Sequence, residues 1–169
     1  MMADLIKKTR DICNELVPPD FRFNELNTAI RQLCLGFSEK TGIECRAEID
    51  EVVKLDFLSM EKKLQVFRII EEALTNAAKH SGANDLIVTM CLSESTGTAA
   101  AGVVLIGISD DGKGFVSPLD NSGQIKPGID KSHIGIISMK ERAAILGGRL
   151  NIITEPGEGT LVCLEIPLF

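Results

Sequence analysis

The sequence predicts an α+β domain in which helices pack on one face of a mixed, mostly antiparallel sheet. The first reason is the order of the expected elements: helix, strand, helix, strand, strand, long loop, helix, strand, strand. The second is composition, because 44% of the 169 residues are hydrophobic and 25% are charged, a balance typical of chains that bury a core without disulfides or metals. The third is that no apolar run approaches the roughly 20 residues needed to span a bilayer.

Charge and cysteine usage limit the partners and the cellular compartment that we expect for the chain. The net charge of −6 repels polyanions at long range, so we expect no nucleic acid partner, and any anionic ligand has to be held by local groups. The five cysteines form an odd set without CxxC spacing, which argues against a disulfide framework and a zinc site. We expect them to be reduced and mostly buried, as in a cytoplasmic protein.

Two helices are expected before the first strand. Residues 3–16 carry apolar side chains at helical spacing, and the proline pair that begins at Pro18 stops this helix. Residues 25–41 carry a second apolar stripe, with Asn24 as the expected N-cap and Gly42 as the end.

A strand, a long helix and a hairpin are expected next. Residues 43–49 alternate between apolar and polar side chains, as a half-buried strand does. Residues 59–79 have an apolar helical face and are followed by a His-Ser-Gly sequence that ends the helix. The β-rich runs 86–93 and 103–109 are separated by small residues that suit a hairpin connection.

The last third of the chain begins with a segment that has no periodicity. Residues 116–131 contain two prolines and two glycines, and loops of this length in compact domains are usually functional lids or disordered. A helix is expected over 134–146, where a Gly-Gly pair follows it. Strands over 149–154 and 160–167 flank a turn of sequence Glu-Pro-Gly-Glu-Gly.

The long helix carries polar residues along one side. At about 100° per residue, Asn76 and His80 fall at the border of the apolar face. A half-buried amide needs hydrogen-bond partners, and a carboxamide oxygen is a suitable hard ligand for Mg²⁺. A solvated helix face is the other interpretation of this pattern. The polar residues on this side are Arg68, Glu72, Asn76, Lys79 and His80.

Two acidic residues directly follow the strand expected over 103–109. Asp110 and Asp111 follow the apolar run, and Gly112 and Gly114 come directly after them. A carboxylate at the end of a buried strand must find hydrogen-bond donors, and the amino group of adenine is one such donor. Glycines lack a Cβ and would let the backbone approach a planar base. A simple Asp-Gly turn is the other interpretation of this sequence.

Residues 132–136 open the helix that follows the predicted lid. Free amides and the positive end of the helix dipole suit a phosphate group at this place, near His133 and Gly135. Alternatively, Gly135 only permits a tight turn and His133 is a surface residue. The patterns of other phosphate-binding families, GxxxxGK[ST], GxGxxG in a βαβ unit, and HRD with DFG, are absent from the sequence.

Four stretches in order resemble the N, G1, G2 and G3 boxes of histidine kinases: residues 68–81, 109–115, 132–148 and 154–160. The last stretch alone is an ordinary hairpin turn, but the four in order outweigh the separate alternatives. The sequences EALTNAAKHS and GIISMKERAAILGG are similar to the subfamily that works with response regulators of the nitrate/nitrite-response type. The resemblance runs from about residue 45 to the end.

The resemblance implies two parts and a fold. Residues 1–42 resemble the second helix of the dimerisation and phosphoacceptor domain, and residues 43–169 resemble the ATP-binding catalytic domain. The implied fold is the Bergerat-type two-layer α/β sandwich, which is shared with gyrase, heat-shock chaperones and mismatch-repair ATPases.

The resemblance also implies how Mg-ATP is bound. Asn76 is expected to ligate Mg²⁺, and Glu72 matches the position that activates water in hydrolysing relatives. Towards the phosphates we expect Lys79, His80, His133, Gly135 and Ile136.

The same resemblance implies a set of residues around the base. Asp110 is expected to accept the adenine amine, Gly112 and Gly114 to border the base, and Thr160 to support the pocket through water.

Two departures from the family pattern bear on function. Ser132 stands where a glycine usually begins the G2 box, so the hinge of the lid lacks the backbone freedom of glycine. Neither His80 nor His133 lies on an earlier helix, where the phosphoacceptor of the family belongs. The chain is therefore expected to be either a fragment of a longer kinase or an ATPase module that depends on a partner.

The expected function is transfer of the γ-phosphoryl group of Mg-ATP to a histidine on a phosphoacceptor domain, for relay to an aspartate of a response regulator. The full-length protein is expected to be a homodimer. Two alternatives stay open: a stand-alone serine kinase of the anti-sigma-factor type, and a non-enzymatic binding module that ATP switches. The dimerisation-like helix within residues 1–42 argues against the serine kinase.

Overall fold

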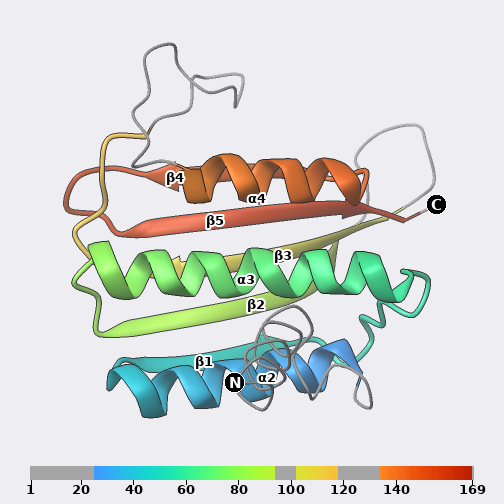
Figure 1. Ribbon diagram of the computed structural model, residues 1–169, viewed down its shortest axis with the longest axis horizontal. Helices are drawn as coiled ribbons and strands as arrows, with labels where there is room; N and C mark the ends of the chain where they lie inside the picture. Colours follow the sequence, from blue (N-terminus) through green and yellow to red (C-terminus); the bar gives the residue numbers. More distant parts are fainter. Residues whose placement is uncertain (1–24, 94–101, 118–133, 169) are drawn as a thin grey trace, which may run out of the picture.

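The computed structural model describes residues 25–93, 102–117 and 134–168, which form two layers. Figure 1 shows α2, α3 and α4 side by side on one face of a five-stranded sheet. The predicted α+β class and the one-sided arrangement of helices are therefore confirmed. In chain order the elements are α2 (Leu26–Thr41), β1 (Glu44–Ile49), α3 (Met60–His80), β2 (Asp85–Ser93), β3 (Val103–Asp110), α4 (Ile134–Ile145), β4 (Arg149–Thr154) and β5 (Thr160–Pro167).

The sheet is mixed and mostly antiparallel, as the element order predicted. Its strands lie in the order β1-β2-β3-β5-β4, and only the β1–β2 pair is parallel. The hairpin predicted between the second and third strands is present as the antiparallel β2–β3 pair. Each of these strands begins and ends within one residue of its predicted limit.

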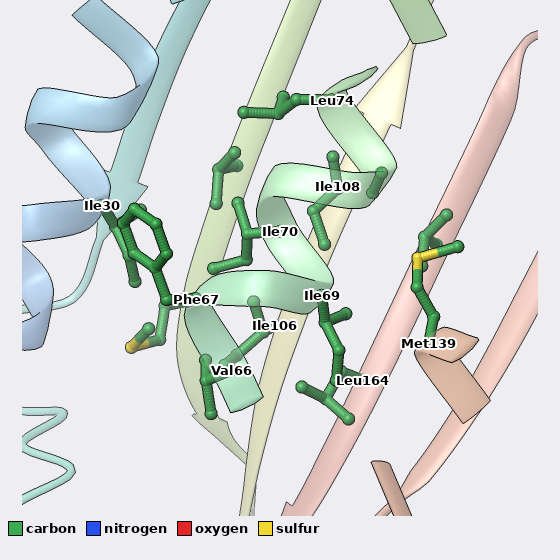
Figure 2. Packing of buried hydrophobic residues seen from close by; sticks show 14 of the residues in the cluster. Ile30, Val66, Phe67, Ile69, Ile70, Leu74, Ile106, Ile108, Met139 and Leu164 are labelled. Atoms are coloured by element: carbon green, nitrogen blue, oxygen red, sulfur yellow. The ribbon is translucent and has the colours of Figure 1, made fainter. Parts of the chain in front are cut away.

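Helix α3 is the centre of the core. Ser59 caps its N-terminus by accepting a hydrogen bond from the Lys62 N–H at 3.3 Å, and Lys79 and His80 in the last turn complement the helix dipole. Figure 2 shows the buried face of α3 packed against the sheet, with α2 and α4 on either side. The buried residues of α3 are Val66, Phe67, Ile69, Ile70, Ala73, Leu74 and Ala77.

Helix α2 belongs to the same hydrophobic core. Gly42 ends it in the left-handed conformation with φ 72°, and its N–H donates to the Ser38 carbonyl oxygen at 2.9 Å. The N-cap is Glu25, which makes no side-chain capping bond, and the predicted cap Asn24 lies outside the described residues. The buried residues Leu26, Ala29, Ile30 and Cys34 join the core of α3 and the sheet. This packing places residues 26–41 within the sandwich, while the division of the chain at residue 42 stays a prediction.

Other expectations are met only in part. Helix α4 ends one residue earlier than predicted, and Gly147 follows it with φ 69°. The four described cysteines are free, but only Cys34 and Cys45 are buried, whereas Cys91 is exposed. No helix among the described residues is long and apolar enough to cross a bilayer. The helix expected over 3–16 and most of the expected lid fall outside the described residues.

Candidate functional site

A pocket of about 380 Å³ lies between the helical layer and the end of the sheet where β3 finishes. It brings together predicted site residues from four separate stretches of the chain. A groove of about 480 Å³ between α2 and α3 is larger, but Lys79 is the only predicted site residue that lines it. The predicted site residues that line the smaller pocket are Asn76, Lys79, His80, Asp110, Gly114, Gly135, Ile136 and Thr160.

The strand register explains the polar end of this pocket. Asp110 of β3 pairs directly with Thr160 of β5, and the next residues on the same face, Ile108 and Val162, also pair. Because alternate residues of a strand point to the same face, Asp110 and Ile108 both face the helices. An acidic group is thereby placed at the end of an apolar wall.

Asp110 is a partly buried acceptor. Burial raises the pKa of its carboxyl above the usual 3.8, because desolvation disfavours the charged form, and hydrogen bonds from the Gly112 backbone and Thr160 oppose that effect. The Gly112 N–H donates to Asp110 Oδ1 at 2.9 Å. A ligand amine that donates to this carboxylate would make a charge-assisted hydrogen bond in a partly dry site.

The neighbouring Asp111 has a structural role. Its Oδ1 accepts hydrogen bonds from the backbone N–H groups of Asn84 at 2.8 Å and Asp85 at 3.0 Å. These bonds lower the pKa of its carboxyl and tie the end of β3 to the start of β2. Of the two adjacent aspartates, only Asp110 lines the pocket.

The two glycines after the aspartates are required by the protein itself. A Cβ on Gly112 would meet Ser81 and the Asp110 carboxylate, and Gly112 does not line the pocket. Gly114 does line the pocket, with φ 59°, and a Cβ there would meet the carbonyl oxygen of Glu155. Either the approach of a base or a simple Asp-Gly turn was predicted for these glycines, and the atoms nearest to their missing Cβ positions belong to the protein.

The turn between β4 and β5 holds the loop that carries Gly114. Thr154 Oγ1 accepts from the Phe115 N–H at 3.0 Å and lies 3.0 Å from the Gly159 carbonyl oxygen, to which it can donate. The Gly157 N–H donates to the Lys113 carbonyl oxygen at 2.7 Å. The turn is an ordinary hairpin turn in topology, yet it supports one rim of the pocket.

Helix α3 supplies the opposite rim. Asn76 is half-buried, as its border position predicted, but His80 is exposed although the same border was predicted for it. Lys79 is exposed and lines both the pocket and the groove between α2 and α3. Glu72 does not line the pocket; it lies beside the first turn of α4, where a Cβ on Gly135 would run into its Oε1. His133 lies outside the described residues.

The apolar walls are the part that sequence reasoning missed. Their signal was present as spacing, since Ile108 lies two residues before Asp110, Val162 two residues after Thr160, and Met139 one helical turn after Ile136. Ser81 was also missed; it is 8% exposed, and its hydroxyl donates to the Ala77 carbonyl oxygen at 2.7 Å. The main apolar lining residues are Ala73, Ala77, Leu86, Ile108, Phe115, Met139, Ile152 and Val162.

The side chains near Gly135 suit a metal ion that binds together with a phosphate-containing ligand. Among the described residues no three His, Cys, Asp or Glu side chains form a metal-binding group. Asn76 and Glu72 both lie next to Gly135, and their side chains include a carboxamide oxygen and a carboxylate. Mg²⁺ keeps several waters and is commonly bound through one or two protein oxygens together with phosphates, so these residues fit Mg²⁺ bound to a nucleotide.

Comparisons with known proteins agree with this geometry. Residues 61–169 match the family of histidine kinase-, DNA gyrase B- and HSP90-like ATPases. The sensor histidine kinase ComP of Bacillus subtilis (strain 168) is 30% identical over 167 residues, which are 99% of this chain and 20% of ComP. The oxygen sensor histidine kinase NreB of Staphylococcus carnosus (strain TM300) is 27% identical over 168 residues, which are 99% of this chain and 44% of NreB. The chain therefore spans less than half the length of these two curated relatives.

Solved structures show the same fold. The histidine kinase domain of the blue-light activated histidine kinase of Erythrobacter litoralis EL346 superposes with a TM-score of 0.60 at 21% identity, covering 85% of this chain and 61% of that one. The histidine kinase AdeS of Acinetobacter baumannii gives a TM-score of 0.59 at 12% identity, covering 85% of this chain and 65% of AdeS. At these identities the likeness concerns the fold alone.

Proposed function

Because the chain belongs to the histidine kinase-, DNA gyrase B- and HSP90-like ATPase family and is the ATP-binding catalytic domain of a sensor histidine kinase, we propose that it presents the γ-phosphoryl group of Mg-ATP to a histidine outside this chain. The phosphohistidine then passes the group to an aspartate of a response regulator. The observation that carries the proposal is the position of Asp110, a partly buried acceptor at the end of an apolar wall.

Asp110 selects the base in this proposal. Its carboxylate accepts a hydrogen bond from the amino group of adenine, while Ile108, Met139 and Val162 contact the faces of the ring. Thr160, opposite Asp110 in the register, keeps the carboxylate oriented. Gly114 borders the base, and Gly112 acts through its hydrogen bond to Asp110.

The phosphates extend towards the exposed rim of the pocket. Asn76 would hold Mg²⁺ through its carboxamide oxygen, and the ion would supply neutralisation of charge on the phosphate oxygens. The side chains of Lys79 and His80 face the phosphates from the end of α3. The backbone of Gly135 and Ile136 contacts them at the first turn of α4. His133 lies outside the described residues, and its contact with the phosphates stays an expectation from the family resemblance.

The transfer step needs positioning more than covalent help from this chain. The imidazole nitrogen of the acceptor histidine attacks the γ-phosphorus, a nitrogen–phosphorus bond forms, and the bond from phosphorus to the bridging oxygen breaks, leaving ADP. Glu72 lies beside Gly135 and would orient the reacting groups without entering a covalent bond. In this proposal the full-length protein acts as a homodimer. The acceptor histidine lies on a helix of its dimerisation domain.

Two measurements test the proposal. Calorimetric titration of the chain with ATP and magnesium should give saturable binding at one site per chain. Incubation with labelled ATP and a separate acceptor domain from the same kinase should label that domain with acid-labile phosphate. The absence of saturable binding would refute the proposal, and acid-stable phosphate would identify a serine kinase instead.

A further inference from the structure

Ser81 is the only buried polar or charged residue in the part of the chain that the structure describes. It directly follows the last residue of α3 and lines the pocket that contains Asp110. Its hydroxyl donates to the Ala77 carbonyl oxygen at 2.7 Å and accepts from the Ala83 N–H at 3.0 Å. Loss of a partner would leave a buried polar group unpaired, which costs free energy. These two bonds therefore fix the turn that leads from α3 into β2.

The loop that follows β3 is packed directly on Ser81. The Ser81 carbonyl oxygen accepts a hydrogen bond from the Lys113 N–H at 2.9 Å. A Cβ built on Gly112 would lie 2.5 Å from Ser81 Cβ and 2.7 Å from Asp110 Oδ1, so both groups lie against the same side of Gly112. The Gly112 N–H donates to the same Asp110 Oδ1 at 2.9 Å. The position of the carboxylate thus depends on a loop that rests on Ser81.

We propose that Ser81 is a positioning residue for adenine, because through Gly112 it holds the Asp110 carboxylate where the amino group of the base reaches it. The inference rests on the proposed function, in which Asp110 accepts that amino group. A hydrogen bond weakens steeply when donor and acceptor move out of line, so a small shift of the loop lowers the affinity for the amino group. Contacts between the ring and the apolar walls are non-directional and should change little.

The Ser81 hydroxyl also acts on the charge of Asp110. A hydrogen bond from Ser81 lowers the pKa of the Asp110 carboxyl and so opposes the larger effect of burial, which raises that pKa. The hydroxyl has one hydrogen, which Asp110 and the Ala77 carbonyl oxygen share. A substitution at Ser81 leaves the charged groups around Asp110 in place. These groups are Asp111, which is adjacent, and Lys79, His80 and Lys113, which line the pocket.

Helix α3 offers a matched control at its other end. Ser59 caps α3 by accepting from the Lys62 N–H at 3.3 Å, and it does not line the pocket. Ser59→Ala and Ser81→Ala each remove one hydroxyl that bonds to the backbone at an end of α3. Both variants should unfold at a lower urea concentration than the wild type. Only Ser81→Ala should change nucleotide binding by the folded protein.

The experiment compares the dissociation constants of ATP and of purine riboside triphosphate, which lacks the 6-amino group, in excess magnesium chloride. Ser81→Ala should weaken the binding of ATP by about threefold to tenfold, the size of effect expected from a misaligned hydrogen bond. Binding of the analogue should change by less than about twofold, because it makes no bond to Asp110. Ser59→Ala should leave both dissociation constants unchanged.

A pH series separates positioning from a general loss of structure. Ser81→Ala removes a hydrogen bond that favours the charged form, so the pKa of Asp110 should rise further. On acidification, ATP binding should therefore weaken at a higher pH in this variant than in the wild type, whereas binding of the analogue should show no such shift. Ser81→Cys keeps a weak donor at the same place and should lie between the wild type and Ser81→Ala.

The inference is overturned if folded Ser81→Ala binds ATP as the wild type does, or if it weakens ATP and the analogue by the same factor. Where Ser81→Ala does not fold, the same comparison made with Ser81→Cys decides. Failure of the wild type to bind ATP, or equal affinity of the wild type for the two nucleotides, would instead refute the proposed function.

Discussion

Replacement of Asp110 by alanine tests the base-binding half of the pocket. The variant loses a charge-assisted hydrogen bond to the adenine amine, which costs about 1.5–3 kcal/mol. This loss corresponds to a roughly tenfold to hundredfold weaker affinity for ATP in a calorimetric titration. The Gly112 N–H loses its acceptor at the same time, but it does so in the free and the bound protein alike, so that cost should appear mainly as lower stability.

Two controls make the result specific to the amine. Asp111→Ala removes a neighbouring carboxylate that bonds to the backbone of Asn84 and Asp85 and does not line the pocket, and it should leave the affinity unchanged. A triphosphate whose purine lacks the 6-amino group should bind the wild type as weakly as ATP binds Asp110→Ala, and the substitution should weaken it no further. An affinity of Asp110→Ala within twofold of the wild type, in folded protein, would refute the assignment.

Three further expectations follow from the same structure. Because burial raises the pKa of Asp110 and its ionised form is the acceptor, ATP binding should weaken on acidification already above pH 3.8, and Asp110→Asn should abolish this dependence in titrations across pH. The same carboxyl holds a proton in the folded state at pH values where the unfolded one does not, so its contribution to stability should fall as pH rises through that interval. Gly114→Ala should destabilise the domain by about 1–3 kcal/mol in urea unfolding, because φ is 59° and the new Cβ meets the Glu155 carbonyl oxygen. Gly36→Ala in helix α2 should instead stabilise the domain by roughly 0.5–1 kcal/mol, because no atom lies within 4 Å of the new Cβ. Ile70→Ala, at a fully buried position of α3, should cost about 2–5 kcal/mol in the same assay, and a loss below 1 kcal/mol would contradict the packing described for the core.

The secondary structure could be predicted almost to the residue because its signals are local. Ser59 and Gly42 mark helix ends through their own hydrogen bonds and backbone angles, and the apolar spacing of β3 and β5 repeats every second residue. These effects act over a few neighbouring residues. The residues close to each helix end or strand are therefore sufficient to predict it.

Contacts between distant segments could not be predicted in this way. Position 114 needs glycine because a Cβ there would meet the carbonyl oxygen of Glu155. Asp111 accepts a hydrogen bond from the backbone N–H of Asn84, which lies 27 residues earlier in the chain. The inclusion of α2 in the core depends on packing against α3 and β1, which no periodicity of α2 itself reveals. The resemblance to kinase boxes placed Asp110, Asn76 and Thr160 in one pocket, but it did not indicate the other contacts of Asp110, such as its hydrogen bond from the Gly112 N–H.

The two halves of the pocket differ in how firmly the fold holds them. Asp110 and Thr160 occupy paired positions of two strands that also pair with further strands, and α3 buries seven residues in the core. Helix α4 buries only Ile136, Met139 and Ala143, and its first turn rests on Glu72 and Asn76. A ligand that touches both halves therefore meets a base site that folding has already formed and a phosphate site whose position depends on two polar side chains. In the proposed binding mode the phosphates would contact this more weakly held half, so we expect nucleotide binding to shift the first turn of α4 more than the strands.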